Sequence, residues 1–391
     1  MKKNSFIIIL ITIFNLTGCA NYQELNDLAL TSALGIDKID DGYQISAQII
    51  NTQNNKNSNI PTSQITVFTS NGKTIQDALR KVILQSPKKL FIEQLDIMVI
   101  SEELATDGLK NIIDFFFRDS ESRGQFNVLI AKDTTAQNIL KVITPLKSIS
   151  SSNIKDRLKL DNKNLAITEM ITFEELINMY LNPHLEIAIP SITIEGSPKE
   201  GDKNENIEQS DSTTKIILSD TAIFKEDKFV SYLSNEENIA FSISKNNVNN
   251  TIITFKCNEN NYTSIELIDV KTKKTISKDK LEITYHISGN ANINEINCQY
   301  DLEKNSNIQE IEKLLNNHIK DIIITTTDKL QKNINSDALG FNDDFYKNSY
   351  KLYELVKNNW YDTYFKQVQI NVKSNIKITE KGKIAKVTKN E

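Results

Sequence analysis

The sequence has 391 residues, of which 39% are hydrophobic and 25% are charged, so it is long enough for two or three domains with apolar cores. A formal net charge of −5, without a long lysine run, argues against a nucleic-acid-binding protein, which needs a basic surface. With 11 glycines and 6 prolines, a Gly-rich phosphate-binding loop is also disfavoured.

Residues 1–18 are predicted to be a lipoprotein signal peptide. Two lysines precede a short apolar run, "FIIILITIFNL", that is too short to cross a membrane as a helix. The tetrapeptide "LTGC" that ends at Cys19 has the form of a lipobox. We therefore expect cleavage before Cys19 and attachment of a diacylglyceryl group to its thiol, because two acyl chains hold a protein stably on a bilayer. An ordinary secretory signal with a chance cysteine is the alternative.

Residues 19–196 are predicted to form an N-terminal mixed α/β domain. It opens with "LTSALGIDKIDDGYQISAQII", in which two β-rich runs flank the turn signal "DDG" and indicate a hairpin. Strand-like runs then alternate with helices, for which the expected N-caps are Thr74, Ser101 and Thr172. The hairpin start indicates a mixed sheet rather than a doubly wound parallel one.

Residues 197–215 contain almost nothing to bury and are predicted to be an exposed polar linker. Residues 216–250 are interpreted as a small hairpin-helix segment, and residues 251–391 as a C-terminal α+β domain. A β-meander there precedes a long helix with an apolar stripe, and an alternating strand closes the chain. The expected fold class mixes α/β and α+β in two to three domains, with mixed or antiparallel sheets packed with helices and one long helix on the C-terminal sheet.

No catalytic motif or metal-ligand spacing is present in the sequence. The histidines lie far apart in the sequence, at His184, His286 and His318. None has a cysteine or a second histidine at the sequence spacing that metal ligands usually have. Carboxylate pairs such as Asp343-Asp344 fit helix starts, where acids offset the helix dipole. We therefore expect no catalytic residue, no metal, no other cofactor and a non-enzymatic function.

Arginine is rare, and three of the four arginines lie between Arg118 and Arg157. Where lysine is the usual cation, an arginine suggests a need for bidentate ion pairing. The stretch "DFFFRDSESRGQ" therefore provides candidates for interaction or structural ion pairs: Asp114, Arg118, Asp119 and Arg123. Two interpretations are open: the ion pairs face a partner, or they tie the end of the helix to acids of its own domain. The second interpretation is favoured.

Two further groups have alternative interpretations. Cys257 and Cys298 lie in strand-like stretches and would pair if their strands are neighbours, but two separate buried thiols are favoured. Aromatic residues recur at helical spacing near the end of the chain and are expected in a core rather than at an interface: Tyr346, Tyr350, Tyr353 and Trp360.

Several stretches resemble the Ger(x)C family, the lipoprotein C subunits of spore germinant receptors. The lipobox followed by "NYQELNDLALTSALGID" resembles the family's start. The resemblance continues through "LFIEQLDIMVISEELATDGLKNIIDFFFRDSESRGQFNVLIAKD" and "DTAIFKEDKFVSYLSNEEN" to "SDALGFNDDFYKN". The chain departs from the family at Ala20-Asn21, where Trp-Asp is usual, and at Gln94, where histidine is frequent.

This resemblance implies a non-enzymatic scaffold or signalling subunit, anchored through Cys19 to the outer face of the spore inner membrane. Its implied partners are two integral-membrane proteins, an A subunit and a transporter-like B subunit, which respond with it to nutrients. The implied fold consists of several α/β domains of unusual topology. A membrane-anchored solute-binding lipoprotein that captures a small nutrient is the alternative function, and the absent motifs disfavour a cell-wall hydrolase.

Overall fold

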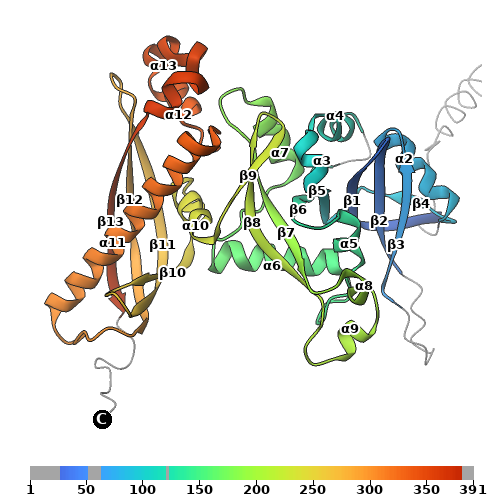
Figure 1. Cartoon of the computed structure of the whole chain (residues 1–391), viewed down its shortest axis with the longest axis horizontal. Coiled ribbons are helices and arrows are strands. Elements are labelled where there is room, and N and C mark those ends of the chain that lie inside the picture. The colour runs from blue at the N-terminus through green and yellow to red at the C-terminus, as the bar shows by residue number, and fades with distance from the viewer. Residues whose placement is uncertain (1–26, 52–62, 120–122, 381–391) are drawn as a thin grey trace, which may run out of the picture.

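The computed structural model describes residues 27–51, 63–119 and 123–380 of the chain. In this part of the chain there are two β-sheets, each packed with helices. Figure 1 shows the larger sheet, built from the N-terminal half, and the smaller sheet with the long helix α11 at opposite ends of an elongated molecule. The signal peptide and Cys19 lie outside the described residues, so both remain predictions.

The larger sheet is mixed, as the hairpin start predicted. Among the described residues it has nine strands in the order β3-β2-β1-β5-β6-β7-β8-β9, with β4 pairing β1 beside this path. Neighbours from β1 to β7 are parallel, and the pairs at both ends are antiparallel. The strands are β1 (Leu28–Ile39), β2 (Gly42–Ile50), β3 (Ile65–Gly72), β4 (Lys89–Phe91), β5 (Ile97–Ser101), β6 (Asn127–Ala131), β7 (Ala188–Glu195), β8 (Lys215–Lys225) and β9 (Lys228–Leu233).

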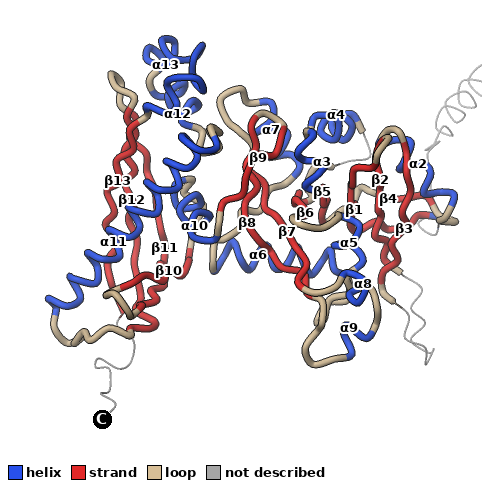
Figure 2. The backbone as a smooth tube through the Cα atoms, viewed as in Figure 1, coloured by secondary structure: helices blue, strands red, loops and turns tan. Residues whose placement is uncertain are grey.

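Helices cover both faces of this sheet (Figure 2). They are α2 (Ile75–Lys81), α3 (Glu102–Asp107), α4 (Lys110–Arg118), α5 (Ala136–Lys141), α6 (Ser150–Asn164) and α7 (Phe173–Leu181). Alternate residues of β5 serve the two faces, because Met98 packs in a core with α3, α4 and α7, whereas Ile97 packs with α5 and α6. The three predicted N-caps are confirmed, and Thr172 forms a complete capping box with Glu175.

The segment that composition predicted to be a linker lies between two neighbouring strands of the larger sheet. It carries α8 (Pro198–Gly201) and α9 (Glu205–Glu208), and then β8 pairs antiparallel with β7. Asn206 is buried there and donates hydrogen bonds to the carbonyl oxygens of Ile143 and Thr214, both at 3.0 Å. The buried amide of Asn206 therefore attaches this segment to its neighbours, a role that buried apolar side chains usually have. The larger sheet continues past residue 215, and the division into domains stays a prediction.

The smaller sheet has the order β10-β11-β12-β13 in the part of the chain that the structure covers. Its strands are β10 (Asn250–Lys256), β11 (Tyr262–Ile276), β12 (Glu282–Ile296) and β13 (Gln369–Glu380), with β12 and β13 parallel. Helix α11 (Asn305–Asp328) lies across it, which confirms the predicted C-terminal sheet with one long helix. Other α-helices in the described residues are α10 (Asn235–Ser244), α12 (Phe341–Asn348) and α13 (Tyr350–Val356).

Cys257 and Cys298 form a disulfide, with 6.3 Å between their Cα atoms. The expectation of two separate thiols is therefore wrong. β10 and β12 both run antiparallel to β11, and both end beside its first residues. The two cysteines just beyond those strand ends consequently meet at one edge of the sheet, which the sequence pattern alone did not reveal.

The C-terminal aromatic residues divide between core and surface. Tyr353 and Trp360 are buried, as expected, whereas Tyr346 and Tyr350 are exposed. The reason is a break at Ser349, which divides the expected single helix into α12 and α13.

Among the helices of the described residues, none is long and apolar enough to span a bilayer.

Candidate functional site

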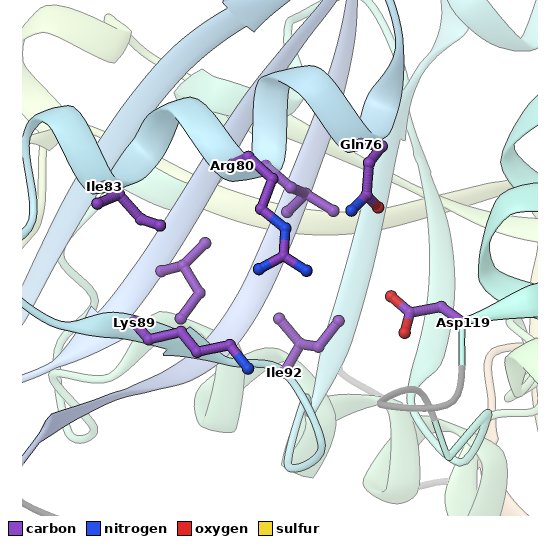
Figure 3. A pocket seen from close by; sticks show the side chains of 8 residues that line it. Gln76, Arg80, Ile83, Lys89, Ile92 and Asp119 are labelled. Carbon is purple, nitrogen blue, oxygen red and sulfur yellow. The ribbon is translucent and has the colours of Figure 1, made fainter. Parts of the chain in front are cut away.

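A pocket lies between α2 and β4, at the end of the molecule far from α11 (Figures 1 and 3). Its volume is about 180 Å³, and it is lined by Gln76, Leu79, Arg80, Ile83, Lys89, Leu90, Ile92 and Asp119. Figure 3 shows Arg80 and Lys89 extending from opposite walls toward the middle, with Asp119 at the side. The pocket thus combines apolar side chains with charged groups that extend into it.

Helical periodicity explains how α2 supplies one wall of this pocket. Ile75, Ala78 and the following Val82 are buried against the larger sheet. Gln76 and Arg80 lie on the neighbouring helix face, as residues four apart do. The opposite wall comes from β4, which pairs in parallel with the first residues of β1, Lys89 opposite Leu28.

The four predicted ion-pair residues do not form one cluster. Arg118 Nε is 2.9 Å from Asp114 Oδ1 one turn earlier in α4, and both side chains are largely exposed. Arg123 instead reaches Glu93 Oε2, also at 2.9 Å. Asp119 lines the pocket wall. Because exposed ion pairs contribute roughly 0–1 kcal/mol, neither pair is a strong structural tie, and their role stays a prediction.

A second pocket, of about 440 Å³, lies where β1 and β5 begin. Asp96 accepts there from Lys155 Nζ at 2.6 Å and from Ser152 Oγ at 3.1 Å. The Arg123–Glu93 pair and Gln94 lie on the same lining. The Asp96–Lys155 pair escaped sequence reasoning because these residues are separated by 59 positions and no local motif connects them.

Buried carboxylates mark the joint between the two sheets. Asp337 accepts hydrogen bonds from the backbone N–H groups of Phe341 and Asn342, both at 2.8 Å, and from Trp360 Nε1 at 3.1 Å. Burial raises the pKa of Asp337 to about 7, even though these three donors favour the charged form. Sequence reasoning missed this group, since only the three-dimensional structure removes it from water.

Glu186 connects the joint to the larger sheet. Its backbone N–H donates to the Asp337 carbonyl at 3.3 Å, and its carboxylate accepts from the Glu226 N–H. Burial raises the pKa of Glu186, and burial beside this carboxylate raises the pKa of Tyr361. Glu186 thus connects Asp337 with the turn between β8 and β9, and it lines a cavity of about 290 Å³.

The three histidines lie in separate places. His184 stacks on Tyr346, His286 contacts Thr275, and His318 lies 3.2 Å from Glu236 Oε1. Across residues 27–51, 63–119 and 123–380, no group of three or more His, Cys, Asp or Glu side chains is arranged to hold a metal ion. The absence of a metal or other cofactor stays a prediction for the whole chain.

Comparisons with known proteins cover nearly the whole sequence. The family model described as "Spore germination protein N-terminal domain" matches residues 21–194, and the one described as "Spore germination B3/ GerAC like, C-terminal" matches residues 219–382. Spore germination protein KC of Bacillus subtilis (strain 168) is 26% identical over 96% of this chain and 95% of its own. The putative spore germination protein YfkR of the same organism is 24% identical over 99% of each chain.

A solved structure has the same fold. The crystal structure of the GerBC protein matches with a TM-score of 0.56 and covers 88% of this chain and 96% of its own. The sequence identity is 17%, so the agreement concerns the arrangement of the elements. The fold therefore recurs in a protein whose sequence differs widely from this one.

Proposed function

The chain belongs to the Ger(x)C family of germinant receptor C subunits in spore germination, and on this basis we propose that it is the lipid-anchored C subunit of a nutrient receptor. One observation carries the proposal: the family similarity extends along nearly the whole chain, in the family's order, and begins two residues after Cys19. The anchor itself is inferred from the lipobox that ends at that cysteine.

The proposed role is that of a non-enzymatic scaffold or signalling subunit. It would act on the outer face of the spore inner membrane with an integral-membrane A subunit and a transporter-like B subunit. The joint between the sheets supports a scaffold role, because the buried Glu186 donates its backbone N–H across it to the carbonyl oxygen of Asp337. A folded body on a membrane tether is suited to presenting its surfaces to neighbouring subunits.

The decisive experiment removes the proposed anchor. In spores that carry Cys19→Ala, the protein is expected to leave the membrane fraction, lose labelling by radioactive palmitate and impair nutrient-triggered germination. Thr17→Ser preserves a small residue in the lipobox and is the matched control, with membrane association and germination retained. Normal germination with a fully soluble Cys19→Ala protein would count against the proposal.

A second candidate function is capture of a small nutrient by this lipoprotein itself. The pocket of about 440 Å³ beside Asp96 favours it, since this volume is within the usual range for small-molecule sites and the lining contains charged groups. Calorimetry of the lipid-free protein against candidate nutrients separates the two functions. Micromolar binding by the isolated protein supports nutrient capture, and no heat of binding supports the scaffold.

A further inference from the structure

One surface of the described chain combines exposed apolar side chains with cations. Ile83 and Leu84, in the turn after α2, are 52% and 85% exposed. Residues 75–92 around them contain four basic residues and one acidic residue, in a chain whose net charge is −5. We call the basic-apolar surface the group formed by Arg80, Lys81, Ile83, Leu84, Lys88 and Lys89.

The cations of this surface differ in how far they are neutralised. Lys81 is paired with Asp77 at 2.6 Å, one turn earlier in α2. The side chain of Arg80 has no hydrogen-bond or ion-pair partner among the residues that the structure describes, and it is exposed and extends from α2 into the pocket. Arginine presents five N–H donors in a planar fork that fits phosphate oxygens. The surface thus offers a phosphate-binding cation beside two large apolar side chains.

The start of the described chain lies at the same end of the molecule. β1 and β4 are parallel and pair from their first residues, Leu28 opposite Lys89. The turn that leads into β4 carries Leu84 and Lys88, so it approaches the sheet from the same end as the residue that leads into β1, Asp27. Asp27 lies eight positions after Cys19, which corresponds to at most about 30 Å in an extended chain.

We propose that the basic-apolar surface rests on the membrane, with Ile83 and Leu84 in the headgroup region and Arg80 and Lys88 against anionic phosphates. The inference rests on the lipid anchor of the proposed function. Charge complementarity supports a bilayer as the occupant, since cations attract anionic lipids and neighbouring aliphatic side chains enter the interface. An orientation follows: the larger sheet lies next to the membrane, and α11 and the smaller sheet project away from it (Figure 1).

A fluorescent label measures this orientation directly. Leu84→Cys is introduced into the full lipidated protein and labelled with an environment-sensitive dye; Cys257 and Cys298 are already paired. The protein is then added to vesicles of phosphatidylcholine with or without 30% phosphatidylglycerol. Leu355→Cys is the matched control, because Leu355 is also exposed, at 71%, but lies on α13 in the C-terminal half.

The label at position 84 is expected to brighten at least twofold on the anionic vesicles, whereas the label at position 355 stays unchanged. Adding Arg80→Glu and Lys88→Glu should abolish most of that gain without removing the protein from the vesicles. Vesicle flotation, compared with Cys19→Ala, reports on the anchor separately. Two results would overturn the proposed orientation. In the first, the protein floats with the vesicles while the dye at position 84 still reports an aqueous environment. In the second, the dye already reports apolar surroundings before vesicles are added.

Discussion

At the scale of single residues, the disulfide between Cys257 and Cys298 is the feature with the clearest energetic consequence. It closes a loop of 41 positions that contains the whole of β11 and β12. A cross-link of this kind stabilises mainly by restricting the unfolded chain, and the effect grows with the length of the loop. The disulfide also agrees with an oxidising compartment, which is the environment expected for an exported protein.

Replacing both cysteines by alanine is expected to lower the free energy of unfolding by roughly 2–4 kcal/mol, because the unfolded chain gains conformational freedom. Urea unfolding followed by circular dichroism measures the change. A reducing agent should destabilise the native protein to a similar extent and leave the double variant unaffected. Equal stability of the two proteins under oxidising conditions would contradict the pairing.

Single residues also show which features could be predicted from the sequence and which could not. Thr74, Ser101 and Thr172 were predicted as caps because a cap depends on residues only three positions apart. The burial of Asp337 and the partner of Asp96 depend on elements that are distant in sequence, so no local pattern contains them. The apolar turn at Leu84 was likewise not recognised, because a buried and an exposed leucine look the same in a sequence.

At the scale of elements, α11 protects the outer edge of β13. Asn316 on this helix accepts from the Ile376 N–H at 2.8 Å and donates to the Ile376 carbonyl at 3.0 Å. Glu312, one turn earlier, accepts from the Ile378 N–H at 2.9 Å. An uncovered edge strand is a template for association with another chain. The two side chains thus act as the missing neighbouring strand.

Asn316→Ala is expected to destabilise the protein by about 1–3 kcal/mol, because it leaves a backbone donor and a backbone acceptor without their partner. The neighbouring Asn317 is exposed, so Asn317→Ala is the matched control and should change stability by less than about 0.5 kcal/mol. Chemical unfolding gives both values, and light scattering on storage reports edge-to-edge association. Similar stabilities for the two variants would show that the helix does not protect this edge.

The elements also show why the sheet order was harder to predict than the strands. Alternation and apolar runs indicated most strands, since each pattern lies within a few consecutive residues. The pairing of β7 with β8 spans two short helices and a polar segment that is typical of a linker. Composition indicates how much apolar surface a segment can bury. It does not reveal that a polar side chain such as the amide of Asn206 is buried.

At the scale of the whole molecule, one apolar cluster includes residues of both sheets. Ile223 of β8 and Leu233 of β9 belong to the larger sheet, yet they pack in the same cluster as α10, α11 and the smaller sheet. Polar bonds cross the joint as well, because Lys245 and Asn247 both contact Glu169. Unfolding one half therefore removes buried contacts from the other.

Scanning calorimetry is expected to record a single unfolding transition whose calorimetric and van't Hoff enthalpies agree. The variant without the Cys257–Cys298 disulfide is the informative comparison, because that bond joins the ends of two strands of the smaller sheet and does not reach the larger one. Its single transition should move to a lower temperature as a whole. Two resolved peaks, of which only one moves, would contradict a shared cooperative unit.

The hairpin of β8 and β9 has a consequence for how such proteins diversify. By sequence most of it belongs to the C-terminal family segment, which starts at residue 219, but by pairing it completes the N-terminal sheet. A genetic crossover in the polar segment before β8 would join a β7 from one parent to a β8 from another. A crossover after Leu233 would keep all these strand pairs from one parent. Recombination between paralogues that leaves both parts folded is therefore expected after the hairpin.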